Sequence, residues 1–121
     1  LNPNILEPNY SMAKILIHED NLSEARSYID RALKINPNNS QTLSISADLY
    51  LRGQDFSQAQ SHAEGALKTN PNNGEARLIL AQIYLNNGDN RSAIDQINMG
   101  LEVERDPERR KQLLRLKENL N

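Results

Sequence analysis

The amino-acid sequence predicts an all-α fold of stacked helical hairpins, and two observations support that prediction. The tripeptide Asn-Pro-Asn begins at residues 2, 36 and 70, so that Pro3, Pro37 and Pro71 are 34 residues apart each time. Between these prolines, apolar and small residues recur at three- and four-residue spacing, which is the period of an amphipathic helix. A fixed period of this kind indicates a repeat protein, in which each unit packs on its neighbours.

A shift of the sequence by 34 residues aligns small residues with small ones and large apolar residues with large ones. The aligned sets are Ala13, Ala47 and Ala81; Ala25, Ala59 and Ala93; Ala32, Ala66 and Gly100; Leu33, Leu67 and Leu101; Leu16, Tyr50 and Tyr84; and Ile15, Leu49 and Ile83. A side chain of one methyl group allows two helix backbones to approach closely. We therefore expect the alanine positions to lie where helices pack.

Each unit contains two apolar stripes, and each stripe predicts a helix. In the middle unit, the first stripe is Leu43, Ala47, Tyr50 and Leu51, and the second is Phe56, Ala59, Ala63, Ala66 and Leu67. The polar segment 52–55 separates them and predicts a turn. Because short connections make neighbouring helices antiparallel, each unit is predicted to be a helical hairpin. The repeats span approximately residues 6–39, 40–73 and 74–106.

The recurring proline has a structural role in this scheme. Proline disfavours the helical conformation in the residue before it and cannot continue a helix, so Pro37 and Pro71 end the second helix of a unit. The asparagines that follow suit the first position of the next helix, because their side chains accept its unpaired N–H groups. Asn72, with Glu75 three residues later, predicts a capping box.

The two ends of the chain differ from the repeats. Residues 107–120 form a leucine stripe in which Lys117 replaces the expected alanine, which predicts a C-terminal capping helix with a solvated outer face. The basic charge of this segment suits either that solvated face or a docking patch for an acidic partner. Residues 1–4 resemble the tail of a preceding repeat, so we expect the chain to be a fragment of a longer protein.

These residues together resemble the tetratricopeptide repeat family, whose 34-residue signature combines an aromatic residue, a small residue and Tyr in the first helix with Ala and Pro in the second. Here the middle copy has Ala47, Tyr50, Ala59 and Pro71 at those positions. The opening aromatic residue is replaced in the three copies by Asn9, Leu43 and Arg77. The resemblance covers about residues 6–105.

The resemblance implies an α-solenoid with a right-handed superhelix, in which the first helix of each hairpin lines a concave face. The peptide-binding positions that it implies on this face are Tyr10, Lys14, Ile17, Gln41, Ser44, Asp48, Leu51, Arg52, Leu78, Gln82, Leu85 and Asn86. Some members hold chaperone C-termini with a Lys/Asn/Arg clamp. Glu75 and Ile79 stand in part of that clamp here, so we reject that function.

The sequence contains no recognisable catalytic, cofactor or metal site. It has no Cys and only two histidines, His18 and His62, which the repeat model places on opposite surfaces. It also has no His-Glu-x-x-His motif and no Gly-rich phosphate loop. No apolar stretch approaches the roughly 20 residues of a membrane helix. The compartment stays open, since cytoplasm and bacterial periplasm are both compatible with a Cys-free chain.

The sequence therefore predicts a protein–protein interaction module that binds a peptide or helical segment within a larger scaffold or assembly protein. The alternative is a structural spacer or self-association unit, whose open N-terminal helix stacks on another repeat. Nucleic-acid binding is disfavoured, because residues 1–104 carry 8 basic and 13 acidic groups and few aromatic residues are available for stacking. An enzyme is the least favoured class.

Overall fold

The computed structural model describes the backbone of residues 6–120 and the side chains from Asn9 to Leu120. This part of the chain forms seven α-helices and no strand, which confirms the predicted all-α solenoid. The helices are α1 (Leu6–His18), α2 (Leu22–Ile35), α3 (Ser40–Arg52), α4 (Phe56–Thr69), α5 (Gly74–Asn86), α6 (Asn90–Val103) and α7 (Pro107–Asn119). The expected tail of a preceding repeat, residues 1–4, lies outside the described residues.

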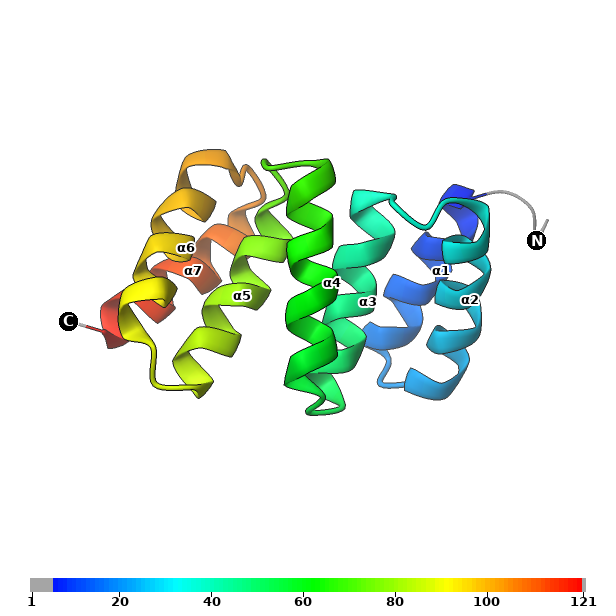
Figure 1. The fold of residues 1–121 in the computed structure, drawn as a ribbon, viewed down its shortest axis with the longest axis horizontal. Coiled ribbons are helices and arrows are strands. Elements are labelled where there is room, and N and C mark those ends of the chain that lie inside the picture. The colour runs from blue at the N-terminus through cyan, green and yellow to red at the C-terminus, as the bar shows by residue number, and fades with distance from the viewer. Residues whose placement is uncertain (1–5, 121) are drawn as a thin grey trace.

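The helices are arranged as a row of hairpins (Figure 1). The pairs α1–α2, α3–α4 and α5–α6 each form one hairpin, and consecutive hairpins meet through α2 with α3 and through α4 with α5. The first helices of successive hairpins also touch, α1 with α3 and α3 with α5. None of the helices in residues 6–120 is long and apolar enough to cross a membrane.

Asparagine and aspartate side chains start six of the seven helices. Asn39 accepts a hydrogen bond from the Thr42 N–H of α3 (2.9 Å), and Asp55 does the same for α4. The capping residue of α5 is Asn73, which accepts from the Ala76 N–H (3.1 Å). The predicted capping box at Asn72 is therefore wrong by one residue.

The cause of this shift is a local turn. The Asn72 N–H donates to the Asn70 side chain (3.1 Å), which is an Asx-turn, and this delays the start of the helix by one position. Glu75 does not fold back to cap the helix. Its carboxylate pairs with Arg109 of α7.

The turn inside each hairpin repeats one backbone conformation. Asp20, Gln54 and Gly88, which are 34 residues apart, have φ angles of 63°, 62° and 79°. This left-handed region suits glycine, yet only the third hairpin has glycine there. Gly53, the glycine of the second turn, has an ordinary φ of −82°.

The aligned alanines lie in the core, as expected. Ala13, Ala25, Ala47, Ala59 and Ala93 have no exposed surface, and each lies at a contact between helices. Leu and Ile side chains fill the remaining volume between hairpins, for example in the cluster that joins α1 and α2 to α3. The core is therefore aliphatic, with helix backbones held close together.

The last helix, α7, is held against α5 and α6 by three kinds of contact. Leu113 is fully buried against Gly100, where a side chain would be crowded. Arg110 donates to the backbone oxygens of Leu101 (2.6 Å) and Glu104 (3.0 Å) at the end of α6. Lys117 donates to the Asn98 side chain (3.0 Å). Part of the basic charge in this segment therefore holds the helix in place.

Candidate functional site

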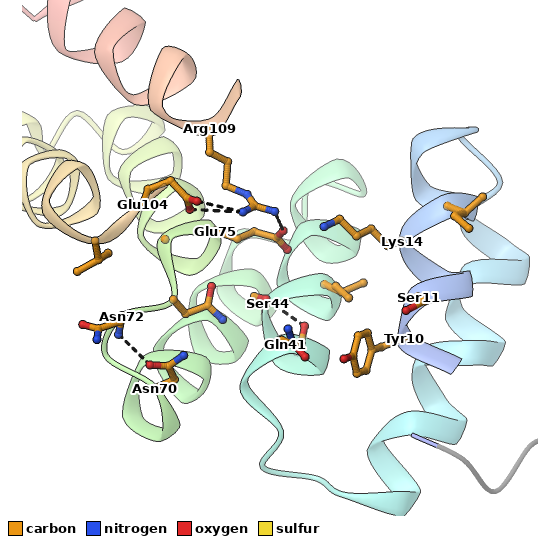
Figure 2. Close-up of a pocket in the computed structure, with 15 residues that line it drawn as sticks. Tyr10, Ser11, Lys14, Gln41, Ser44, Asn70, Asn72, Glu75, Glu104 and Arg109 are labelled. Atoms are coloured by element: carbon orange, nitrogen blue, oxygen red, sulfur yellow. Dashed lines mark hydrogen bonds and ion pairs between the residues drawn. The ribbon is translucent and has the colours of Figure 1, made fainter. Parts of the chain in front are cut away.

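A groove with a volume of about 500 Å³ opens between the first helices of the hairpins (Figure 2). One wall is α1, with Tyr10, Ser11, Lys14 and Ile15. The floor comes from α3 and includes Gln41, Ser44 and Ile45. The other wall is the loop and first turn of α5, together with Val103, Glu104 and Arg109 from the α6–α7 region. The groove thus draws on every hairpin of the structure.

The structure brings together four of the residues that the sequence places on the binding face. Tyr10 and Lys14 of α1 and Gln41 and Ser44 of α3 all line the groove. Asp48 and Arg52 lie farther along α3 and pair with each other, with 3.2 Å between the Asp48 Oδ1 and the Arg52 Nε. The part of these residues in binding stays a prediction.

The other expected groove residues lie elsewhere. Ile17 and Leu78 belong to the core, with exposed fractions of 2% and 6%. Leu51 is half-buried against the cluster between α3, α4 and α5. Gln82 and Leu85 are half-buried and Asn86 is exposed at the end of α5, and none of the three lines the groove.

The sequence analysis missed an ion-pair network at the α5 wall. Arg109 of α7 donates to Glu75 (3.1 Å) and to both oxygens of Glu104 (3.4 Å each), so that two carboxylates share one guanidinium. A signal was present in the sequence. Arg109 follows Glu75 by 34 residues, one repeat period, so the two residues occupy the same place in successive first helices.

Glu104 is well compensated in this network. It is 8% exposed, accepts the Asp106 N–H (3.0 Å) and lies against Gly74 at the N-terminus of α5. The partial positive charge of a helix N-terminus favours a carboxylate there. A Cβ at position 74 would overlap the Glu104 carboxylate, which explains the glycine.

Glu75 is less well compensated. Burial raises the pKa of its carboxyl group above the ordinary value, even though Arg109, Lys14 and a hydrogen bond from Ser44 act in the opposite direction and Asp48 adds to the rise. Its side chain is 19% exposed and faces the groove. Lys14 extends toward it from α1 across the groove (Figure 2). Within residues 6–120, the exposed Lys14 ammonium makes no ion pair or hydrogen bond.

The arrangement favours recognition. Amide and hydroxyl groups of Gln41, Asn70 and Ser11 can exchange hydrogen bonds with a peptide backbone, and Ile15 and Val103 offer apolar contacts. Among the described residues, no cluster of His, Cys, Asp and Glu could hold a metal ion. His62 contacts the Tyr50 ring between α3 and α4, away from the groove.

Comparison with known proteins identifies the repeat. A family model described as "Tetratricopeptide repeat" matches residues 50–116, more than half of the chain, and a second model with the same description matches residues 6–39. The chain belongs to the tetratricopeptide repeat family. Members of this family are typically non-catalytic interaction modules, and this assignment supports a role in protein binding.

Solved tetratricopeptide structures share the fold. YrrB, titled a TPR protein with an unusual peptide-binding site, aligns with a TM-score of 0.75 and 20% identity, covering 98% of this chain and 61% of its own. The Arabidopsis OM64 TPR domain has a TM-score of 0.80 and 18% identity, covering 98% of this chain and 99% of its own. MamA has a TM-score of 0.73 and 13% identity, with coverages of 98% and 81%. No curated protein matches the sequence.

Proposed function

We propose that this tetratricopeptide domain binds an extended or helical segment of a partner protein in the groove between α1, α3 and the α5 wall, as part of a larger scaffold or assembly protein. One observation carries the proposal: an open groove of about 500 Å³, to which every hairpin contributes, combines polar backbone-binding groups with apolar side chains. The domain acts by binding alone and carries out no catalysis.

The test is a selection of random dodecapeptides displayed on phage, followed by measurement of Kd for the selected sequences by fluorescence anisotropy. The blocking variant is Ser11→Trp, because Ser11 is exposed on α1 and lines the groove. A tryptophan there fills the groove, so we expect Kd to rise more than about tenfold, which corresponds to about 1.4 kcal/mol.

The matched control is Ser61→Trp, which places the same side chain at an exposed position of α4 that does not line the groove. We expect its Kd to match that of the wild type. Equal affinities for the wild type and Ser11→Trp would move binding to another surface, and a selection that yields no binding sequence would reject the function.

A second candidate function is self-association through α1, and one observation favours it. Ile15 is 52% exposed, whereas its counterparts one and two repeats later, Leu49 and Ile83, are buried against the preceding hairpin. A hairpin stacked on α1 would cover Ile15 in the same way. Sedimentation velocity tests this idea: a concentration-dependent increase that Ile15→Glu abolishes supports it, and a monomer at all concentrations rejects it.

A further inference from the structure

Charge is distributed unevenly around the groove, and this distribution bears on the chemistry of the partner. The lining contains two carboxylates, Glu75 and Glu104, and two cations, Lys14 and Arg109. These charges cancel formally, but they differ in how well the solvent and the protein compensate them. That difference decides which added charge the groove favours.

The α5 wall has fewer cations than carboxylates. Arg109 alone serves both Glu75 and Glu104, and the backbone N–H of Asp106 and the N-terminus of α5 compensate only Glu104. Glu75 faces the groove with one ion pair, at 3.1 Å, and little contact with water. A second cation in front of Glu75 would balance the wall at two carboxylates and two cations.

The α1 wall is different, because Lys14 is exposed and hydrated. Adding a counter-charge to a solvated ammonium group gains little, as measurements on surface ion pairs show. The same addition gains more at a partly buried carboxylate, where the effective dielectric constant is lower. The raised pKa of Glu75 agrees with this, since it shows that burial of the charge outweighs the attraction of Arg109 and Lys14.

The charge of the repeats points in the same direction. Residues 1–104 carry 8 basic and 13 acidic groups, and this acidic surface surrounds the groove. Such a field attracts a basic segment and increases its rate of association.

From the contacts of Glu75 and the charge of the repeats, we infer that the groove selects a partner segment carrying a lysine or arginine, whose side chain lies against Glu75. This inference rests on the proposed function. The basic side chain adds a second cation beside the Glu75–Arg109 pair, and the segment backbone lies over Gln41 and Ser44 on the floor of the groove. Lys14 faces the same space and repels that cation.

Two conservative variants with opposite expected effects test the inference. Glu75→Gln keeps an acceptor for Arg109 but removes the charge, and Lys14→Gln removes the opposing cation. Using dodecapeptides selected on the wild type, we expect Glu75→Gln to raise Kd by about tenfold and Lys14→Gln to lower it by about two- to threefold. Circular dichroism should show the same helix content and thermal unfolding for each variant as for the wild type.

The sequences of the selected peptides provide a second readout. We expect Lys or Arg to be enriched at one position in peptides selected on the wild type, and this enrichment to disappear in a selection on Glu75→Gln. Peptides enriched in Asp or Glu, or the reverse effects on Kd, would overturn the inference and assign an acidic partner to Lys14. Selected peptides without any charge preference would also overturn it while leaving groove binding intact, whereas no selected peptides at all would reject the proposed function itself.

Discussion

Asn73, the capping residue of α5, is hydrogen-bonded to Ser40, the first residue of α3, one hairpin earlier. The Asn73 amide donates to the Ser40 hydroxyl (2.9 Å) and to its backbone oxygen (3.2 Å), and the Ser40 hydroxyl donates to the Ala66 oxygen near the end of α4 (2.8 Å). A single side chain therefore starts one helix and links it to two others.

This link predicts a difference between two asparagine caps. Asn73→Asp keeps the acceptor for the Ala76 N–H but loses both donated bonds and places a carboxylate beside the Ser40 oxygen. We expect the free energy of unfolding to fall by about 1–2 kcal/mol. Urea denaturation measures the change.

Asn39→Asp is the control, because Asn39 caps α3 by accepting from Thr42 alone among the contacts described here. Asp and Asn are similar as N-caps, so we expect a change within about 0.5 kcal/mol. Equal losses at the two positions would show that the bonds to Ser40 contribute nothing.

The left-handed turn residues predict a stabilising change. Gln54 has a φ of 62° without being glycine, so Gln54→Gly relieves the conformational cost while adding some chain entropy to the unfolded state. We expect a net gain of about 0.5–1 kcal/mol in thermal or urea unfolding.

Two glycine variants calibrate this expectation. Gly88→Ala places a side chain at φ 79° and is expected to destabilise the fold by about 1 kcal/mol. Gly53→Ala, one residue before Gln54, has an ordinary φ and only van der Waals neighbours, so we expect little change. A loss at Gln54→Gly as large as that at Gly88→Ala would contradict the backbone argument.

Arg110 anchors α7 through the backbone of α6, so its removal is expected to weaken that contact. Arg110→Met keeps most of the aliphatic stem and removes the bonds to Leu101 and Glu104. We expect a loss of about 1.5–3 kcal/mol in urea unfolding, because hydrogen bonds from a charged group are involved. Arg115→Met, at an exposed position of the same helix, should change stability by no more than about 0.5 kcal/mol.

His62 predicts a loss of stability in mild acid. Burial lowers the pKa of its imidazole below the ordinary 6.5, and its Nδ1 atom is buried without a hydrogen-bond partner. As the pH falls below 6.5, the unfolded chain takes up a proton that the folded protein resists, so the free energy of unfolding decreases.

The variant His62→Phe keeps a ring against Tyr50 and removes the titrating group. We expect its stability to fall less than that of the wild type between about pH 7.5 and pH 5.5. His18→Gln, which replaces an exposed histidine, is the control. Identical pH profiles for the wild type and His62→Phe would contradict the assignment.

Much of the fold could be predicted from the sequence, because the features that determine it repeat. The 34-residue period, the alanine positions and the proline after each second helix predict hairpins that are present. The exact start of α5 could not be predicted, since Asn70, Asn72 and Asn73 all suit a cap. The hydrogen bonds of the folded loop decide among them.

The site was less predictable, for a physical reason. A first helix packs against neighbours on more than one side, so a residue assigned to its groove face by pattern alone can instead enter the core, as Ile17 and Leu78 do. Arg109 lies in the helix that departs from the repeat, and its ion pairs depend on how that helix docks. Periodicity describes the repeated hairpins well and their terminal contacts poorly.

The fully buried alanines separate two tasks within one short chain. Contacts between hairpins depend on residues such as Ala47 and Ala59, none of which lines the groove. Ser11, Lys14 and Gln41 line it from exposed positions and contribute little to the core. The surface chemistry of the groove can therefore diverge by substitution while the scaffold stays constant, which allows one architecture to acquire new partners without refolding.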